Sequence, residues 1–226
     1  MKGKDSFRKL KRRDPLLRFR YDESLQVFRY LRGNLAEFGI QDVKALRRSA
    51  ARFLKTHADL LGRVGRERLE VVQETQDAQG GWNLTLQQYH GAVPVSGGSV
   101  SFHVNQKGVL HTVNNRLFPD LGDVPHKPRI SDERAIRTAQ GVTKGKNHPG
   151  RKPELLVYRY TGKPLLVWKV RLNDSKKGAR NAPAQWIVYV DAVLDKVLFY
   201  YDDVQTAEPE VAHGADYYSG SGSLNA

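Results

Sequence analysis

The sequence contains no cysteine among its 226 residues. This absence excludes disulfide bonds, thiolate zinc sites, iron–sulfur clusters and a cysteine nucleophile. The sequence also lacks an apolar run long enough to cross a bilayer as a helix. Its N-terminal stretch is positively charged but has no apolar run of about seven or more residues, so it shows no recognisable secretory signal peptide.

The motifs of common catalytic sites are missing as well. The glycine-containing stretches lack the lysine of a phosphate-binding loop, and the serines near Ser219 lack the strand and helix of a nucleophile elbow. No histidine is followed by glutamate and no two histidines lie four residues apart, so the zinc-binding HExxH helix is absent. We therefore predict no catalytic residue, cofactor or metal site in this chain. The seven histidines are His57, His90, His103, His111, His126, His148 and His213.

The net charge of +13 is concentrated at one end of the chain. Residues 1–20 hold nine lysine or arginine and two aspartate residues, a local charge of +7. We interpret residues 1–24 as a basic, solvated N-terminal tail. The basic loop Lys144–Lys152 would add to a nucleic-acid-binding surface, but no basic and aromatic interleaving of a known module supports that alternative.

Residues 25–122 show alternating strand and helix patterns. Residues 27–33 read as a short strand closed by Gly33, and apolar side chains at three- and four-residue steps predict a helix over 41–61 that Gly62 ends. His57 falls on the apolar stripe and is interpreted as a core histidine rather than a ligand. Residues 68–77 and 81–90 predict a hairpin.

The stretch from Leu86 to Val113 carries three of the histidines and predicts further hairpins that turn at the Gly97-Gly98 pair and at Asn105–Gly108. Pairing of Val104 with Val109 places His111 on the face of Val100 and Phe102. His103 then points out of the opposite face, and the two histidines do not converge on one metal.

Prolines mark residues 123–130 as a linker to a second unit at 131–205. Ser131 is a plausible N-cap for a helix to about Val142. Four strand-like runs rich in β-branched and aromatic residues follow, which predicts an antiparallel meander beside one helix. The chain is therefore predicted to be α+β, with two small domains that each combine an antiparallel sheet and a packed helix. Residues 206–226 read as an exposed extension.

The order of these patterns resembles the N-terminal propeptide of thermolysin-like zinc metallopeptidases, the fungalysin/thermolysin propeptide. The resemblance includes the upstream stretch "FRYLRGNL", which is similar to the family's first propeptide strand, and the helix "ARFLKTHADLLG", and it continues through the hairpins to "LFPDL". The matching positions are Gln88, Tyr89, Gly91, Val93, Pro94, Val95, Gly97, Gly98, His103, Gly108, Val113, Asn115 and Pro119.

The second unit resembles the PepSY domain of the same precursors, which is cystatin-like. Its "VDA" motif is Val190, Asp191 and Ala192, and Asp195 replaces the usual turn glycine. The segment "HGADYYSGSGSLNA" resembles the first strand of a mature protease. Only the basic tail lies outside the resemblance, which covers about residues 25–226.

The resemblance implies a secreted prosegment that inhibits a thermolysin-like catalytic domain, in cis or in trans, and acts as its folding chaperone. Zinc and calcium are expected only in such a catalytic domain. A free-standing inhibitory or protein-binding module is the alternative. The expected protease contacts are Tyr89, Gly91, Val93, Pro94, Val95, Asp202 and Asp203, and the expected processing region includes Thr206, Ala207, His213, Gly214 and Ala215.

Overall fold

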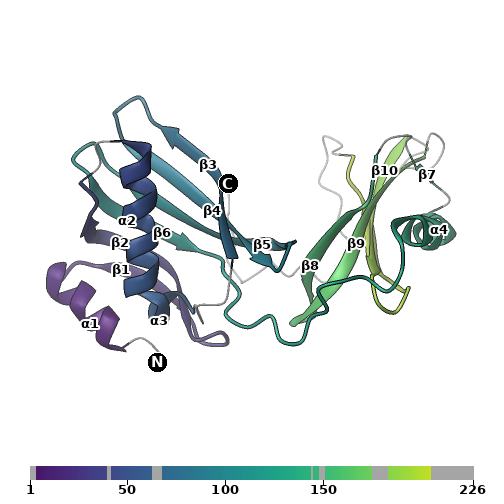
Figure 1. The fold of residues 1–226 in the computed structure, drawn as a ribbon, viewed down its shortest axis with the longest axis horizontal. Helices are drawn as coiled ribbons and strands as arrows, with labels where there is room; N and C mark the ends of the chain where they lie inside the picture. The colour runs from purple at the N-terminus through teal and green to yellow at the C-terminus, as the bar shows by residue number, and fades with distance from the viewer. Residues whose placement is uncertain are drawn as a thin grey trace, which may run out of the picture. The chain divides into compact units, whose positions relative to one another are not determined.

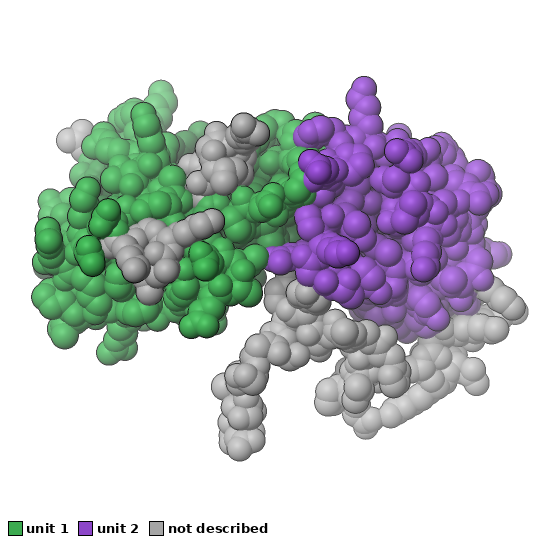
Figure 2. All heavy atoms as spheres, turned by 90° about the horizontal axis from the view of Figure 1, so that it is seen from below, with its two compact units in different colours: residues 1–122 green, residues 123–226 purple. Residues whose placement is uncertain are grey.

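The computed structural model describes residues 4–39, 42–62, 68–143, 145–147, 151–174 and 183–204. The chain divides into two compact units, residues 1–122 and 123–226 (Figure 2). Four helices and a larger number of strands make up the regular structure of the described residues, so the fold is α+β. None of these helices combines the length and the apolar character that a membrane-spanning segment needs.

Unit 1 contains a six-stranded antiparallel sheet in the order β3-β4-β5-β6-β2-β1. Along β5, apolar side chains such as Val100 and Phe102 are buried and alternate with half-buried polar ones, as expected for a strand with one face on a core. Its strands are β1 (Arg18–Asp22), β2 (Val27–Glu37), β3 (Arg68–Gln76), β4 (Trp82–His90), β5 (Val93–Val104) and β6 (Val109–Asn115).

Helix α2 (Val43–Thr56) covers one face of this sheet (Figure 1). The side chain of Asp42 accepts a hydrogen bond from the backbone N–H of Ala45 and caps the helix start. The buried stripe of α2 includes Phe53, whose ring meets that of Phe102 at 6.0 Å between centroids. The amphipathic pattern in the sequence therefore identified the packed face correctly.

The single helix predicted over 41–61 is in fact two helices. His57 ends α2, because its φ of −115° and ψ of 30° lie outside the helical region although its N–H still donates to the carbonyl of Phe53. Helix α3 (Ala58–Leu61) follows, and Gly62 ends it in the left-handed conformation, as predicted. A Cβ on Gly62 would lie 2.3 Å from a methyl of Val27, so a larger residue does not fit there.

The prediction of a solvated basic tail is wrong for the part of it that the structure describes. Lys4–Arg13 form helix α1, and Leu10 is only 3% exposed within the core of unit 1. The ring of Phe7 stacks on that of Phe28 at 4.8 Å. The charges face outward while a few apolar side chains pack inward, so the helix belongs to the fold.

The short strand predicted to end at Gly33 continues to Glu37 as β2. The side chain of Asp14, which follows α1, accepts a hydrogen bond from the backbone N–H of Asn34. A Cβ on Gly33 would lie 2.4 Å from that carboxylate oxygen, and the φ of Gly33 is +152°. The glycine therefore admits the Asp14 side chain to the strand and does not end it.

Unit 2 contains a second antiparallel sheet, with α4 (Asp132–Thr143) packed on one face (Figure 1). Strand β9 pairs with β8, β7 and β10, and β10 pairs with β11. The four predicted strands are present, and the two-residue β7 is an additional strand that pairs with β9. The strands are β7 (Lys146–Asn147), β8 (Glu154–Tyr160), β9 (Lys163–Asp174), β10 (Ala184–Asp191) and β11 (Val197–Asp202).

The turn between β10 and β11 is tight although aspartate stands where a glycine is expected. Asp195 has a positive φ of 54°. Its carboxylate accepts a hydrogen bond from the hydroxyl of Thr138 at 2.6 Å and pairs with Arg134, both on α4. These contacts lower the pKa of Asp195, the bond from Thr138 contributing most, and they fasten the turn to the helix.

We predict that Leu10→Ala destabilises unit 1 by about 2–4 kcal/mol, the usual cost of truncating a buried leucine. The reason is that Leu10 is 3% exposed inside the core. The control is Leu16→Ala, because Leu16 is 86% exposed and its truncation is expected to change little. Urea unfolding followed by circular dichroism measures both variants, and equal stabilities would show that α1 does not pack.

Candidate functional site

The turn between β4 and β5 contains the five predicted contact residues of unit 1. Tyr89 pairs with Pro94 across the hairpin, and Gly91 takes a positive φ of 61° in the turn. Val93 and Val95 are 5% and 1% exposed. These two valines therefore belong to the core, and of the five predicted residues only Tyr89, Gly91 and Pro94 are accessible to a partner.

Strand β3 supports this turn from the side. The guanidinium carbon of Arg68 lies 5.3 Å from the centroid of the Tyr89 ring, a cation–π distance. The same guanidinium donates to the carbonyl of Gly91 at 3.4 Å and pairs with Glu70. The half-exposed tyrosine is therefore held in one orientation.

Two buried amide side chains fix the ends of the hairpins. Gln88 is 0% exposed, and its amide exchanges two hydrogen bonds of 2.9 Å with the backbone N–H and carbonyl of Phe118. A Cβ on Gly98 would lie 2.8 Å from the Gln88 side-chain oxygen. The glycine therefore leaves room for the amide that ties β4 to the segment after β6.

The second amide, Asn115, joins three separate segments. Its Nδ2 donates to the carbonyl of Phe28 on β2 at 2.9 Å and to that of Leu61 on α3 at 3.1 Å. Its Oδ1 accepts from the N–H of Leu117 at 3.0 Å. Because Asn115 is 1% exposed, water does not replace these bonds when they are lost.

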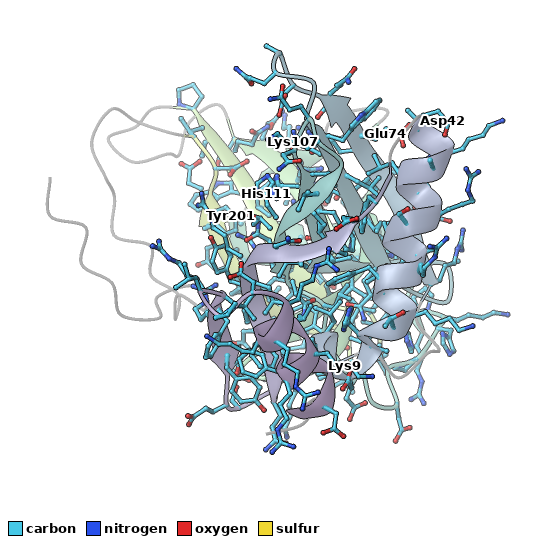
Figure 3. The ribbon with its side chains drawn as sticks, turned by 90° about the vertical axis from the view of Figure 1, so that its left-hand side faces the viewer. Lys9, Asp42, Glu74, Lys107, His111 and Tyr201 are labelled. Atoms are coloured by element: carbon cyan, nitrogen blue, oxygen red, sulfur yellow. The ribbon has the colours of Figure 1, made fainter. Side chains whose placement is uncertain are left out.

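The face of the unit 1 sheet opposite α2 is polar, and we call it the outer face. Thr85 and Ser101 hydrogen-bond across β4 and β5 at 2.9 Å between their hydroxyl oxygens. Figure 3 labels Asp42 at the start of α2 and shows His111 on the side of the sheet away from that helix. By strand alternation and contact, the outer face comprises Arg32, Asn83, Thr85, Ser101, His103, His111 and Asn114.

The prediction that His103 and His111 lie on opposite faces is wrong. Their ring centroids are 6.4 Å apart. Val104 pairs with Leu110 and not with Val109, and the register shifts between His103 and Val104. This bulge places one extra residue, His111, in β6 and reverses the face to which it points.

The environment of His103 favours a structural role over metal binding. Its Nδ1 lies 2.6 Å from Oδ1 of Asn83, and its Nε2 lies 3.2 Å from Nδ2 of Asn114. Both ring nitrogens are therefore engaged, while Nδ1 of His111 lies 2.9 Å from the hydroxyl of Thr112. In the described residues, no group of three or more histidine, aspartate or glutamate side chains is placed to hold a metal ion.

Protonation of the outer-face histidines is disfavoured. Burial lowers the pKa of His103, and the neighbouring His111 lowers it further. Burial also lowers the pKa of His111, to which Arg32 adds while Asp77 opposes. At neutral pH both rings are therefore neutral, and the outer face offers amide, hydroxyl and imidazole hydrogen-bonding groups beside the Arg32 cation.

The two predicted contact residues of unit 2 lie at the end of β11. The carboxylate of Asp202 accepts hydrogen bonds from the N–H groups of Gln185 at 2.9 Å and Val204 at 3.1 Å. The N–H of Asp203 donates to the carbonyl of Gln185 at 2.7 Å. Asp202 therefore fixes the end of the sheet, and only the Asp203 side chain is left for other contacts.

An aromatic cluster occupies the sheet face of unit 2 opposite α4. The rings of Tyr189 and Phe199 stack at 4.4 Å, and Tyr158 lies 4.9 Å from Tyr189. Burial raises the pKa of Tyr189 well above its usual value, with a further contribution from Tyr201. The sequence showed these aromatics as strand formers, and only the observed pairing shows that they share one face.

The predicted processing residues lie outside the described part of the chain. Thr206, Ala207, His213, Gly214 and Ala215 therefore remain expectations from the sequence.

Comparison with known families supports the sequence resemblance. Residues 67–117 match the family described as the Fungalysin/Thermolysin Propeptide Motif, which corresponds to β3 through β6 and the segment after it. The chain therefore carries a thermolysin-family propeptide region.

Curated relatives include thermolysin of Alicyclobacillus acidocaldarius, 27% identical over 162 residues, with 66% of this chain and 28% of the relative covered. Neutral protease B of Bacillus subtilis is 24% identical over 144 residues, with 61% and 26% covered. The match thus spans only about a quarter of each relative. The solved Bacillus megaterium YpeB C-terminal domain aligns over 90% of this chain and 96% of that chain at 13% identity, with a TM-score of 0.38 that is too low to establish a common fold.

We predict that Asn115→Ala destabilises unit 1 by about 2–4 kcal/mol, because three buried backbone groups lose their partner. Asn114→Ala is the matched control, since that half-buried side chain bonds only His103 among the described contacts and its loss is expected to cost about 1 kcal/mol. Urea denaturation compares the two. A larger loss for Asn114→Ala would contradict the assigned roles.

We also predict that the folded state loses stability as pH falls from 8 to about 5.5. His57, His103 and His111 each have a folded pKa below the ordinary value of 6.5, so the unfolded chain binds more protons near and below that value. Stability is full above 6.5 and declines as pH falls toward the lowered pKa values. Unfolding free energies of the native protein and of His103→Gln/His111→Gln test this prediction, and the double variant should show a weaker pH dependence.

Proposed function

We propose that this chain is the prosegment of a thermolysin-like metallopeptidase precursor, which inhibits the catalytic domain and assists its folding. The observation that carries the proposal is that the propeptide motif at 67–117 forms the hairpins of unit 1, and these supply most of the outer face. The proposed secretion, and the domain limits at 25–122 and 131–205 with a PepSY-like second domain, rest on the sequence resemblance. No catalytic role is assigned to this chain.

The outer face is the surface proposed to contact the catalytic domain. Its polar side chains are held in place before binding, as the Thr85–Ser101 and Asn83–His103 bonds show. Preorganised groups lose little conformational entropy on association. A contact of about 800 Å² per partner is typical of tight protease–inhibitor complexes. The neighbouring Tyr89 supplies an aromatic side chain at the rim, held by Arg68.

Inhibition requires the prosegment to cover the cleft without being cut quickly. The segment beginning at Asp202 is the proposed covering strand, because Asp202 fastens its start to the sheet of unit 2. Processing is proposed within residues 206–215, followed by mature sequence. Zinc and calcium would belong to the catalytic domain.

The chaperone role follows from the same contact by thermodynamic linkage. A surface that binds the native protease and not its unfolded chain stabilises the native form, by about 2.7 kcal/mol when the prosegment concentration is 100 times Kd. The prosegment therefore needs to fold before its partner. Short hairpin connections in both units favour early folding.

The test mixes the full chain with a separately purified thermolysin-like protease. The rate at which the protease hydrolyses a peptide substrate measures inhibition. We expect inhibition below micromolar concentration of the chain. Arg32→Glu reverses a charge on the outer face and is expected to weaken inhibition by about tenfold or more, equivalent to about 1.4 kcal/mol.

Arg48→Glu provides the matched control, because Arg48 is an exposed arginine on α2, on the other side of the sheet. It is expected to leave inhibition unchanged. Equal effects of the two reversals would reject the outer face as the contact surface, and absence of inhibition at micromolar chain would reject the inhibitor role itself.

A further inference from the structure

Unit 1 contains a cavity on the side of the sheet opposite the outer face. It lies between α1, β2 and α2 and has a volume of about 450 Å³, within the range of small-molecule sites. Its apolar wall includes Leu35, Phe38 and Phe53, all nearly fully buried. Figure 3 shows Lys9 on α1 beside one end of α2, and Lys9 belongs to the cavity rim.

The rim of the cavity carries uncompensated positive charge. Arg13 and Glu37 both line it, but they pair with each other at 2.8 Å. Lys9 and Arg52 also line it, and neither forms an ion pair with a carboxylate in the described part of the chain. The remaining charge therefore complements an anion.

A residue with an unpartnered buried polar atom also lines the cavity. His57 lines it and is only 8% exposed, and its Nδ1 has no hydrogen-bond partner among the described residues. The ring packs on Phe53 at 4.4 Å between centroids. An unsatisfied buried polar atom costs about 1–3 kcal/mol, which a ligand oxygen at this position would offset.

The ionisation of His57 agrees with this arrangement. Burial lowers its pKa, the Lys9 charge on α1 lowers it further, and Asp59 on α3 opposes the change. The imidazole is therefore neutral at neutral pH. It offers one hydrogen bond, while Lys9 and Arg52 supply the charge.

We propose that this cavity binds a small carboxylate with an apolar body. The carboxylate contacts the cationic rim and the Nδ1 of His57, and the apolar body packs against Phe38 and Phe53. Two sources share this chemistry, a free aliphatic acid and the C-terminal carboxylate of a peptide that ends in apolar residues. Because α2 and the outer face lie on opposite sides of one sheet, this site is independent of the proposed protease contact.

Titration calorimetry with the full chain tests the proposal with four probes. Octanoate and octanamide form one pair, and N-acetyl-Leu-Leu with a free or an amidated C-terminus forms the other. We expect at least one acid to bind, and its amide to bind about tenfold or more weakly because a charge-assisted contact is lost. The tighter acid identifies the source.

Matched variants locate the site. Arg52→Gln is expected to weaken binding of the acid about tenfold, whereas Arg48→Gln, one helical turn away on the exposed surface of α2, leaves it unchanged. His57→Phe, which keeps an aromatic ring, removes the hydrogen bond and also weakens binding. Absence of binding by both acids at millimolar concentration, equal binding of acid and amide, or equal effects of the two arginine variants would each overturn the proposal.

Discussion

The hydrogen bonds of two buried amides, Gln88 and Asn115, hold together the parts of unit 1 on which the rest depends. Asn115 connects β2, α3 and the segment after β6, while Gln88 connects β4 to the same segment. These segments are far apart in sequence and meet at the side chains of Gln88 and Asn115. A buried amide that satisfies several backbone groups can position them only in one relative arrangement, because any displacement leaves a polar group without a partner.

Within the matched residues 67–117, this constraint couples a glycine to an amide. A Cβ on Gly98 would lie 2.8 Å from the Gln88 oxygen, so a larger residue would have to displace the buried amide. The motif residues Gln88, Gly98 and Asn115 thus have an architectural role, as do Val93 and Val95 in the core. The positions available for recognition are the intervening ones that point to the outer face. A rigid frame that presents polar side chains on one face agrees with the binding role proposed for unit 1.

Local patterns in the sequence predicted the α+β class, the stripe of α2, the hairpin of β3 and β4, the turn at Asn105–Gly108 and the four strands of unit 2. The turn predicted at Gly97-Gly98 is wrong, because β5 runs from Val93 to Val104 through both glycines and the chain reverses at Gly91 instead. Local patterns failed where long-range contacts decide the outcome. Helix α1 has few apolar residues among its ten. The sequence pattern of this helix therefore does not predict that Leu10 packs into the core. The bulge that turns His111 to the outer face changes the register by a single residue, and alternation alone cannot locate it.

The role of Gly33 illustrates the same limit. A glycine after a strand pattern is typical of a strand end, but here it admits the carboxylate of Asp14 from a distant turn. That contact fastens the end of α1 to β2, and α1 in turn forms one wall of the cavity. The N-terminal charges therefore act at the rim of a defined cavity near His57 as well as in solvent. The two sides of the sheet thus differ in chemistry: the outer face carries mainly neutral hydrogen-bonding groups, and the cavity side carries cations around an apolar wall.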